Sequence, residues 1–437
     1  MKKVAVNTLG CRTNQLESSM IIDDFKIHGW EIVKFTEIAD IYIINTCTVT
    51  GKSDTNSRYY IRQAKRINPN AKIVVTGCYA QTSAEELSKL DEIDLIIGNT
   101  EKNNLFEIVK DRLFKSIDNK IIVADIMQQS EFGDKKALSA SGRTRANIKI
   151  QDGCNYRCSY CIVPYARGKS RSNSIDNVLD QIIRITEQGY KELIISGIHL
   201  GQWGLDLSPQ NSLASLIKEI ERIEELKRFR ISSIDPMEFN DDLIETLINS
   251  KKFCKHLHIS LQSGSDEILK QMKRRYNVEY YTNLINNLTQ NIPNLAVGSD
   301  IIVGFPGETQ ELFDITYQNL KNLPISYIHV FSYSRRKGTP ADKMPNQVHD
   351  HIKKQRNTLL NELAAEKNLE FRKSQIGKET EILVEFSRDK KTGFLKGMTD
   401  NYISVQVEGD DSYINSLTKV IITEVTSECT KGKIVAT

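Results

Sequence analysis

Three cysteines stand close together in the middle of the chain, at Cys154, Cys158 and Cys161. Thiolates are ligands for soft metals, zinc and iron–sulfur clusters among them. A [4Fe–4S] cluster normally takes four cysteines, and no fourth cysteine lies near this loop. The spacing therefore predicts a cluster with one iron open to an outside ligand. The alternatives are three buried free thiols or a structural zinc site, although zinc would want a fourth Cys or His at a second knuckle.

The same loop resembles the signature of the radical S-adenosylmethionine superfamily. That signature has this cysteine spacing and an aromatic residue just before the last cysteine, a place that Tyr160 fills here. The resemblance implies a [4Fe–4S] cluster on the three cysteines. It also implies that S-adenosylmethionine binds the open iron through its amino and carboxylate groups, with Tyr160 at this cofactor site.

The composition is that of a soluble protein with several domains. The chain has 437 residues, 39% of them hydrophobic and 26% charged, and this length predicts about three domains. A net charge of +3 does not by itself indicate a nucleic-acid partner. The N-terminus carries no apolar signal region, and no apolar run approaches the ~18 residues of a membrane span, so we expect a cytoplasmic protein without a membrane partner. Eight cysteines in such a chain favour metal binding over disulfides.

Residues 1–125 alternate short apolar strands with helical stretches, which is typical of a parallel sheet covered on both faces. The expected strands are Val4–Thr8, Ile41–Ile44, Ile73–Val75 and Leu95–Ile97. The first three of these strands are followed by Cys11, Cys47 and Cys78, respectively. Ligands of such sheets bind beyond the carboxyl ends of the strands, so we expect the three thiols to meet at one edge and hold a second cluster. The alternative is three unrelated buried thiols.

Residues 126–146 are polar and rich in glycine and serine, which predicts a linker. From 147 to 373, strands and helices alternate in the manner of repeated βα units. We expect six parallel strands in a partial (β/α)6 barrel, at Asn147–Gln151, Leu193–Ser196, Arg228–Ser232, His256–Leu261, Leu295–Val303 and Tyr327–Tyr333. The expected helices include Asn177–Gln188 and Leu213–Leu226.

Glycines and small polar residues follow three of these strands, at the carboxyl ends where barrel chemistry takes place. A glycine there lets the backbone approach a ligand closely. By resemblance to the superfamily, these segments contact the adenine, ribose and methionine parts of S-adenosylmethionine. The residues expected to do so are Gly197, Gln262, Ser263 and Gly304. We expect His199 and His258 to pack or hydrogen-bond rather than to act as ligands.

The last part of the chain, residues 374–437, switches to a period of two, which predicts a small all-β barrel after a basic packing helix over His349–Lys373. The expected strands are Thr380–Phe386, Gly393–Gly397, Tyr402–Glu408, Val420–Val425 and Gly432–Ala436. This segment resembles the TRAM domain, an RNA-binding module, and such barrels bind RNA with basic and aromatic side chains. The candidates are Phe386, Arg388, Lys390, Lys391, Phe394 and Lys396. Cys254 and Cys429 are interpreted as free thiols.

Over nearly its whole length the chain resembles the radical S-adenosylmethionine methylthiotransferases. The motifs that carry the resemblance are Gly10-Cys11-x-x-Asn14, Asn45-Thr46-Cys47, Gly77-Cys78, Gln151–Cys154, His258–Ser265 and Met272–Tyr276. The isopentenyladenosine branch usually reads Gly-Cys-Gln-Met-Asn at the first cysteine. This chain has Arg12 and Thr13 there, which favours the branch that modifies N6-threonylcarbamoyladenosine at position 37 of tRNA. Ser53, where that branch commonly has alanine, is a small departure.

This resemblance implies a division of labour between two [4Fe–4S] clusters. The cluster on the cysteine loop cleaves S-adenosylmethionine to a 5′-deoxyadenosyl radical, which activates an adenine carbon that no side chain could deprotonate. The cluster at the sheet edge carries the inserted sulfur, which a second S-adenosylmethionine methylates first. The resemblance also implies an electron donor such as flavodoxin or ferredoxin, and a tRNA anticodon loop held by the C-terminal barrel.

A threonylcarbamoyl group brings a carboxylate near the adenine, and a buried carboxylate without a partner is costly. We therefore expect one arginine to pair with it bidentately, while most of the candidates bind phosphate. The candidates are Arg167, Arg171, Arg274, Arg335 and Arg336. Two other substrates stay open, isopentenyladenosine of tRNA and a ribosomal-protein aspartate. A non-catalytic iron–sulfur protein that binds RNA or transfers electrons is the alternative of another class.

Overall fold

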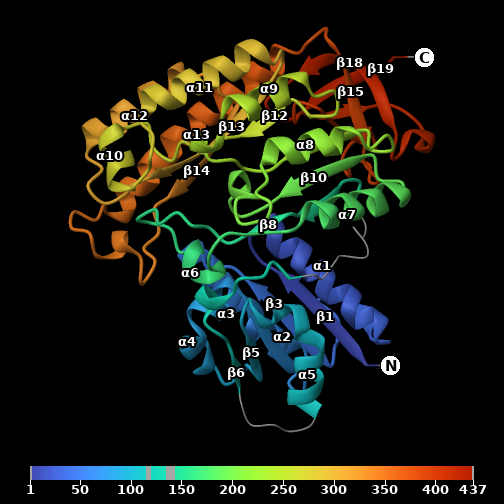
Figure 1. The fold of residues 1–437 in the computed structure, drawn as a ribbon, viewed down its shortest axis with the longest axis vertical. Helices are drawn as coiled ribbons and strands as arrows, with labels where there is room; N and C mark the ends of the chain where they lie inside the picture. The colour runs from blue at the N-terminus through green and yellow to red at the C-terminus, as the bar shows by residue number, and fades with distance from the viewer. Residues whose placement is uncertain (1, 115–119, 134–142, 436–437) are drawn as a thin grey trace. The chain divides into compact units, whose positions relative to one another are not determined.

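The computed structural model describes residues 2–114, 120–133 and 143–435 of the chain (Figure 1). These residues form two compact units. The first unit comprises residues 1–141, 151–173 and 334–342, and the second comprises residues 142–150, 174–333 and 343–437. The central cysteine loop thus belongs to the same unit as the N-terminal cysteines. Part of the expected linker, residues 134–142, lies outside the described residues.

The first unit is built on a six-stranded parallel sheet with the order β2-β1-β3-β4-β5-β6. The strands are β1 (Lys3–Thr8), β2 (Glu31–Val33), β3 (Ile41–Thr46), β4 (Lys72–Gly77), β5 (Leu95–Ile97) and β6 (Ile121–Ile122). The helices are α1 (Arg12–Ile27), α2 (Gly51–Ile67), α3 (Cys78–Thr82), α4 (Ala84–Ser88) and α5 (Leu105–Phe114). The four predicted strands are confirmed. The two edge strands were missed because they are short and only partly buried.

Alternate residues of the central strands pack into two separate cores, one on each face of the sheet. Tyr42 of β3 packs with Ile61 of α2, while its neighbour Ile43 packs with Phe25 of α1. All of these side chains are fully buried. A strand that is covered on both faces is apolar over consecutive positions, which explains the hydrophobic run Ile41–Ile44 in β3.

Short elements complete the first unit around the cysteine loop. They are β8 (Gln151–Asp152), α6 (Val163–Arg167) and β9 (Arg171–Ser172), with β8 and β9 antiparallel. Helix α3 packs against α6. The returning segment 334–342 is tied in by the N–H of Ala341, which donates to the Ser159 carbonyl at 2.8 Å.

The second unit contains two three-stranded parallel sheets, ordered β11-β10-β7 and β12-β13-β14. The strands are β7 (Ala146–Lys149), β10 (Glu192–Ser196), β11 (Arg228–Ile231), β12 (His256–His258), β13 (Ala296–Val303) and β14 (Tyr327–Ser332). Isolated bridges, including one between Ile234 and Ile259, join β11 to β12. The six strands therefore form the predicted partial (β/α)6 barrel.

Helices follow the barrel strands as expected. They are α7 (Ile175–Glu187), α8 (Leu213–Glu221), α9 (Asp241–Asn249), α10 (Asp266–Gln271), α11 (Val278–Asn291), α12 (Gln310–Asn322) and α13 (Asp350–Lys373). The prediction extended α8 to Leu226, which was wrong. The N–H groups of Arg222 and Ile223 bond to carbonyls three residues back, so the chain tightens into a turn there.

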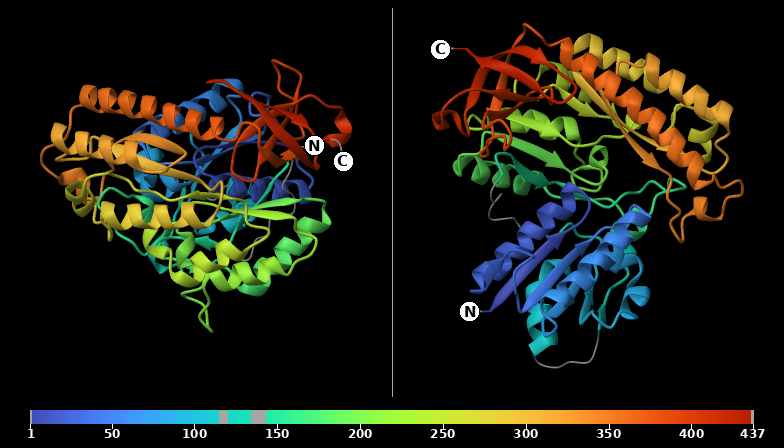
Figure 2. Two further views of the ribbon diagram at one scale, coloured as in Figure 1. Left: turned by 90° about the horizontal axis from the view of Figure 1, so that it is seen from above. Right: turned by 180° about the vertical axis from the view of Figure 1, so that it is seen from behind.

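The C-terminal strands close into a barrel with the order β15-β16-β17-β19-β18 (Figure 2). They are β15 (Glu379–Val384), β16 (Leu395–Thr399), β17 (Ser404–Val407), β18 (Leu417–Val425) and β19 (Thr430–Ile434), so the predicted all-β barrel is confirmed. Ala436, at the end of the last predicted strand, lies outside the described residues. The barrel interior is filled by aliphatic side chains such as Ile382, Val405 and Val420.

Buried charges attach this barrel to β11. Glu192 on β10 accepts from Arg228 at 2.6 Å and from Arg230 at 2.7 Å. Burial alone would raise the pKa of Glu192, but the two guanidinium groups outweigh it and lower that pKa. The arginines then donate 2.8 Å hydrogen bonds to the carbonyls of Met398 and Asp400 in the C-terminal barrel.

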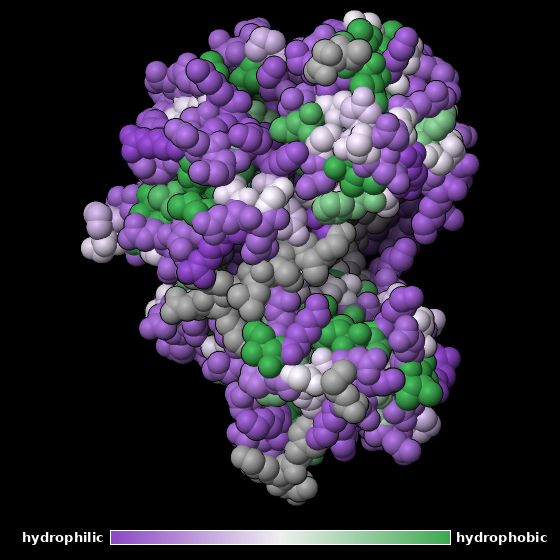
Figure 3. All heavy atoms as spheres, turned by 90° about the vertical axis from the view of Figure 1, so that its right-hand side faces the viewer, coloured by the Kyte–Doolittle hydropathy of each residue, from purple (hydrophilic) through white to green (hydrophobic). Residues whose placement is uncertain are grey.

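Among the described residues, no helix is both long and apolar enough to cross a bilayer. The face drawn in Figure 3 is mostly hydrophilic, with hydrophobic side chains in separate small groups. Scattered exposed apolar residues of this kind are normal for a folded protein.

Candidate active site with two groups of cysteines

The first group of cysteines lies at the carboxyl ends of three neighbouring strands. In the sheet register, Thr8 pairs with Asn45 and Thr46 pairs with Gly77. Cys47 and Cys78 therefore follow their strands at the same level, and Cys11 follows β1 beside them. A Cβ atom built on Gly10 would lie 2.8 Å from the sulfur of Cys47, so only glycine lets the Cys11 loop approach this thiol so closely.

Burial and hydrogen bonding shape these thiols. Burial raises the pKa of Cys47 to about 11, and the neighbouring Cys78 and Cys11 add to the shift. The pKa of Cys78 is also raised by burial, against the opposing field of Arg167. The backbone of Val49 and the side chain of Ser53 act in the opposite direction and lower the pKa of Cys47, by less than burial raises it. Buried thiols with amide and hydroxyl donors around them suit thiolates bound to a metal cluster, whose charge replaces their protons.

The second group sits in the loop between β8 and α6. The Cys154 N–H donates to the Gly168 carbonyl, and the Cys161 N–H donates to the Cys158 carbonyl, both at 3.0 Å. The Tyr156 N–H approaches the Cys154 sulfur at 3.4 Å. Gly153 has φ +73°, and a Cβ there would lie 1.9 Å from the Lys169 carbonyl oxygen. The three cysteines are partly exposed, which leaves this loop accessible to a ligand.

A buried arginine joins the two cysteine groups. Arg167, 2% exposed, ends helix α6. Its Nη1 donates to Glu17 at 2.8 Å and to Asp152 at 3.1 Å, and its Nη2 donates to Asn14 at 2.6 Å. Lys102 donates to the second oxygen of Glu17 at 2.6 Å. Burial alone would lower the pKa of Arg167, but Glu17 and Asp152 hold it well above its ordinary value.

This network fixes three backbone segments at once. Asn14 and Glu17 lie in the first turns of α1, directly after Cys11, and Asp152 lies two residues before Cys154. These side-chain contacts therefore link the two cysteine groups within the first unit. Sequence reasoning missed the contact between Glu17 and Arg167, because the two residues are 150 positions apart and nothing in the sequence pairs them.

The five arginines proposed for a substrate carboxylate all face acidic side chains of the protein. Arg167 pairs as described, and Arg171 lies 3.9 Å from Asp152. Their partners in the remaining pairs are Asp235 for Arg274, Asp342 for Arg335 at 3.1 Å, and Asp54 for Arg336 at 2.5 Å. A substrate carboxylate would have to compete with these partners.

The strand-end residues proposed for S-adenosylmethionine lie where the sequence indicated. Gly197 follows β10, Gln262 and Ser263 follow β12, and Gly304 follows β13. Gly304 has φ +71°, and its N–H donates to Glu308 at 2.6 Å. Tyr160 belongs to the first unit, next to Cys161.

Two of these residues are already engaged by the fold. The Gln262 N–H donates to the Asp300 carbonyl at 2.8 Å, and the residue adopts φ +71°. The buried Ser263 hydroxyl accepts from the Ser265 N–H at 3.2 Å and lies 3.4 Å from the Thr316 hydroxyl. Gln262 and Ser263 therefore shape this turn, whatever else they contact.

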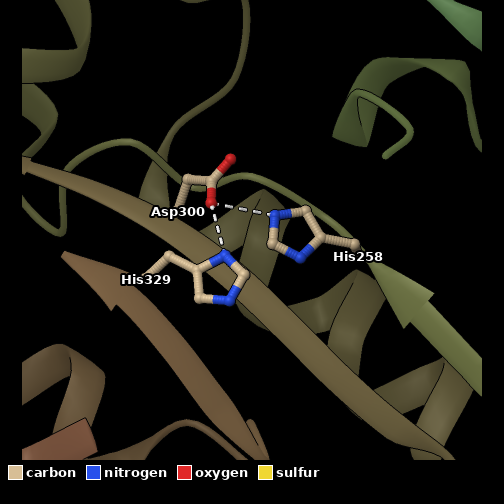
Figure 4. A group of neighbouring side chains, drawn as sticks. All are labelled: His258, Asp300 and His329. Carbon is tan, nitrogen blue, oxygen red and sulfur yellow. Dashed lines mark ion pairs between the residues drawn. The ribbon is translucent and has the colours of Figure 1, made fainter. Parts of the chain in front are cut away.

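The two histidines expected to pack or hydrogen-bond do so. His199 lies 3.0 Å from Glu238, and His258 lies 3.0 Å from Asp300. Sequence analysis did not anticipate that His329, on the next strand, would join the same carboxylate at 3.3 Å. Together His258, Asp300 and His329 form a compact polar group on three adjacent strands (Figure 4).

The candidate RNA-binding residues of the C-terminal barrel differ in their availability. Arg388 is held by Asp411 at 2.7 Å and by the Gly393 and Gly409 carbonyls. Lys390 and Lys391 lie on an exposed turn closed by Asp389, which accepts from the Lys391 N–H at 3.0 Å. Phe386 is 48% exposed. The lysines and Phe386 are thus better placed than Arg388 to meet a polyanion.

Comparison with known families places the chain in a class. Residues 148–320 match the radical SAM superfamily, and residues 3–98 match an uncharacterized protein family, UPF0004. The solved structure of the radical S-adenosylmethionine methyltransferase TsrM from Kitasatospora setae, with tryptophan and a SAM analogue bound, superposes with a TM-score of 0.57. It covers 78% of this chain and 75% of its own, at 15% identity, so the likeness concerns the fold. The fold is that of a radical SAM enzyme.

Curated relatives narrow the class to a family. The threonylcarbamoyladenosine tRNA methylthiotransferases MtaB of Aquifex aeolicus and Bacillus subtilis are 39% and 40% identical, over 96% and 97% of this chain and 100% and 94% of their own. A tRNA-2-methylthio-N(6)-dimethylallyladenosine synthase of Acetivibrio thermocellus is 33% identical over 99% of this chain and 91% of its own. The chain belongs to the radical S-adenosylmethionine tRNA methylthiotransferase family.

Membership in this family rules out two alternatives, one for the metal and one for the class of protein. The cofactors are two [4Fe–4S] clusters and S-adenosylmethionine, so the structural zinc alternative for the cysteine loop is set aside. The protein is an enzyme, so the non-catalytic iron–sulfur protein was the wrong alternative.

Proposed function

We propose that this enzyme inserts a methylthio group at C2 of N6-threonylcarbamoyladenosine 37 in tRNA. The observation that carries the proposal is the pairing of two three-cysteine groups within one unit, joined by the buried Arg167 network. A reaction that needs a radical and a sulfur source calls for two such groups at a fixed separation.

In this proposal the six cysteines are the metal ligands. Cys154, Cys158 and Cys161 hold the cluster that S-adenosylmethionine completes, while Cys11, Cys47 and Cys78 hold the sulfur-donating cluster. When bound, the clusters and S-adenosylmethionine supply the radical and the sulfur. The Tyr156 N–H, 3.4 Å from the Cys154 sulfur, is placed to stabilise the thiolate form of that ligand.

A further set of residues is proposed to bind and orient S-adenosylmethionine. Tyr160, Gly197, Gln262, Ser263 and Gly304 are proposed to contact S-adenosylmethionine, the glycines because their backbone admits close approach. Glu308, ion-paired with Arg356 at 2.6 Å, accepts from the Gly304 N–H and so holds the turn after β13.

The C-terminal barrel is proposed to act as a TRAM domain and to hold the anticodon loop. The exposed lysines of the turn after β15 would neutralise phosphates, and Phe386 offers a ring for stacking. An electron donor such as flavodoxin or ferredoxin is proposed to reduce the cluster on the cysteine loop. A tRNA substrate makes the cytoplasm the proposed site of action.

Two features support threonylcarbamoyladenosine over isopentenyladenosine. The MtaB of Bacillus subtilis, named for the first modification, is 40% identical to this chain, whereas the synthase of Pelotomaculum thermopropionicum, named for the second, is 34% identical. The residues after the first cysteine, Arg12 and Thr13, also differ from the Gln-Met of the isopentenyl branch. The names of both groups specify tRNA, which disfavours a ribosomal-protein aspartate.

Two measurements test the proposal. Nucleoside mass spectrometry of tRNA from cells that lack the enzyme should show threonylcarbamoyladenosine without its methylthio form. Purified enzyme, offered two anticodon stem-loops that differ only in the N6 group, should modify the threonylcarbamoyl one. Modification of the isopentenyl stem-loop alone would leave the family standing and overturn the substrate.

A further inference from the structure

One face of strands β12, β13 and β14 carries a group of polar side chains, and the opposite face is buried. The register pairs Gly298 with Tyr327 and Asp300 with His329, so these residues share a face. Between them, Ser299 and Ile301 are fully buried on the other face. Tyr281 of helix α11 packs behind that other face, where its hydroxyl donates to the Ile259 carbonyl at 2.7 Å. The polar face is therefore the inner face of the partial barrel.

Asp300 is the centre of this face (Figure 4). Its Oδ1 lies 3.0 Å from His258 Nε2 and 3.3 Å from His329 Nδ1, and its Oδ2 accepts from the Ser260 hydroxyl at 3.0 Å. Burial alone would raise the pKa of Asp300, but the bonds from both histidines outweigh it and hold that pKa well below its ordinary value. Asp300 is thus a carboxylate that orients two imidazoles.

Both ring nitrogens of His258 face polar groups of the protein. His258 Nδ1 lies 3.1 Å from the Tyr327 hydroxyl, which also lies 2.7 Å from His256 Nε2. Gly298 leaves room for this arrangement, because a Cβ there would lie 1.9 Å from the Tyr327 ring. His258 and Tyr327 therefore form a fixed support for Asp300.

The His329 imidazole is much more exposed than its two neighbours. The His329 side chain is 56% exposed, against 27% for Asp300 and 12% for His258. Its Nδ1 faces Asp300, and among the described residues no hydrogen-bond partner meets its Nε2. The protein has thus fixed the orientation of an imidazole whose second nitrogen points away from its own carboxylate.

The position of this group suits a substrate rather than the fold. His258 ends β12 and Asp300 lies in β13, each four residues before Gln262 or Gly304, which follow these strands. Four residues of extended chain span about 13 Å. Gln262 and Gly304 are proposed contacts of S-adenosylmethionine. The histidine group is therefore deeper inside the same barrel, along the inner face.

The threonylcarbamoyl group needs partners of this kind. It carries a ureido linkage, a hydroxyl and a carboxylate, whereas an isopentenyl group offers none of these. The candidate arginines already face protein carboxylates. An imidazole oriented by Asp300 accepts at Nε2 when neutral and donates there when protonated, so it can meet the ureido N–H or the carboxylate.

We propose that His329, oriented by Asp300, binds the polar threonylcarbamoyl group and discriminates against the isopentenyl group. This inference rests on the proposed function. A site built to hydrogen-bond a substrate rejects an analogue that lacks the polar group, because its own polar atoms would be left unpaired. Asp300 is a positioning residue, and His329 is the residue that touches the substrate.

The test compares variants on two anticodon stem-loops, one with each N6 group. His329→Leu should lower kcat/KM for the threonylcarbamoyl stem-loop about 10- to 100-fold, mainly through KM, as expected for one hydrogen bond to a charged group. It should leave the isopentenyl stem-loop unaffected or improved. His329→Gln should recover part of the loss, and Asp300→Asn should give an intermediate loss. Cleavage of S-adenosylmethionine without RNA should persist in all three variants.

Phe331→Leu is the matched control, since Phe331 lies two residues further along the same face and is 44% exposed. It should change both substrates alike. If wild-type enzyme prefers the threonylcarbamoyl stem-loop and His329→Leu keeps the same preference, the inference about His329 is overturned. The proposed function would still hold. Wild-type enzyme that modifies only the isopentenyl stem-loop would overturn both. If wild-type enzyme binds one equivalent of a non-iron metal and His329→Leu does not, the His258, Asp300 and His329 group is a metal site. That result would also overturn the inference.

Discussion

Arg167 and Glu17 face each other as a bidentate pair, with Nη1 2.8 Å from Oε1 and Nη2 3.1 Å from Oε2, although 150 residues separate them in the chain. Parallel hydrogen bonds of this kind fix direction as well as distance. One end of the pair belongs to the helix after Cys11, and the other belongs to the helix after Cys161. This pair, together with the bonds from Arg167 to Asp152 and Asn14, connects the segments that carry the two cysteine groups.

Removing this arginine should destabilise the enzyme strongly. Arg167→Met leaves the buried carboxylates of Glu17 and Asp152 without their main partner, which costs about 3–5 kcal/mol for a broken buried pair. Denaturant unfolding measures the loss. The control is Arg184→Met, because Arg184 is 59% exposed and its pair with Asp180 should contribute less than about 1 kcal/mol. Equal effects of both substitutions would contradict the role of the buried network.

The cysteine assignment predicts an iron count. Anaerobic reconstitution should give close to eight irons per chain, about eight being the sum of two [4Fe–4S] clusters. Replacing Cys154, Cys158 and Cys161 with alanine should leave about four, and so should replacing Cys11, Cys47 and Cys78. Replacing Cys254 and Cys429, which lie outside both groups, should change nothing. Loss of all iron on removal of either group alone would argue against two independent clusters.

The two groups should also separate by activity. Cys158→Ala should abolish reductive cleavage of S-adenosylmethionine, because the open iron disappears with its cluster. Cys47→Ala should retain cleavage and release 5′-deoxyadenosine, yet insert no sulfur into RNA. Product analysis by mass spectrometry distinguishes the two outcomes. Abolished cleavage in Cys47→Ala, in protein that still binds four irons, would refute the division of labour.

The exposed turn of the C-terminal barrel should contribute to tRNA binding. Replacing Lys390 and Lys391 with serine should weaken binding and reduce the slope of log affinity against log salt by about 1 for each phosphate that is no longer neutralised. Lys218→Ser, at an exposed lysine on α8 that pairs with Asp242, is the control. Point substitutions are preferable to deletion of the barrel, which would strip Arg228 and Arg230 of their acceptors. An unchanged salt slope would assign RNA binding to another surface.

Local pattern was enough to predict most of the fold. Continuous apolar runs indicated β3 and β4, and the period of two indicated the C-terminal barrel. The edges of the first sheet escaped prediction because β2 and β6 are short and only partly buried. The clustering of Cys11, Cys47 and Cys78 could also be predicted, because each follows a strand and parallel strands end at the same edge of the sheet.

The rest of the site depends on contacts that no local pattern contains. Arg167 was a candidate for the substrate, yet its partners come from α1 and from β8. His329 drew no attention, because its significance depends on Asp300 in the neighbouring strand and on His258 in the next. Only the register of three strands brings these side chains onto one face. Long-range pairing of this kind requires the folded structure.

The attachment of the C-terminal barrel has a consequence for how such enzymes diversify. Arg228 and Arg230 donate to main-chain carbonyls of residues 398–400, so they recognise the course of the backbone and not any particular side chain. Mutations at the surface of the barrel leave these acceptors in place. The side chains proposed to bind RNA can therefore change without loss of the contacts that attach the barrel to β11.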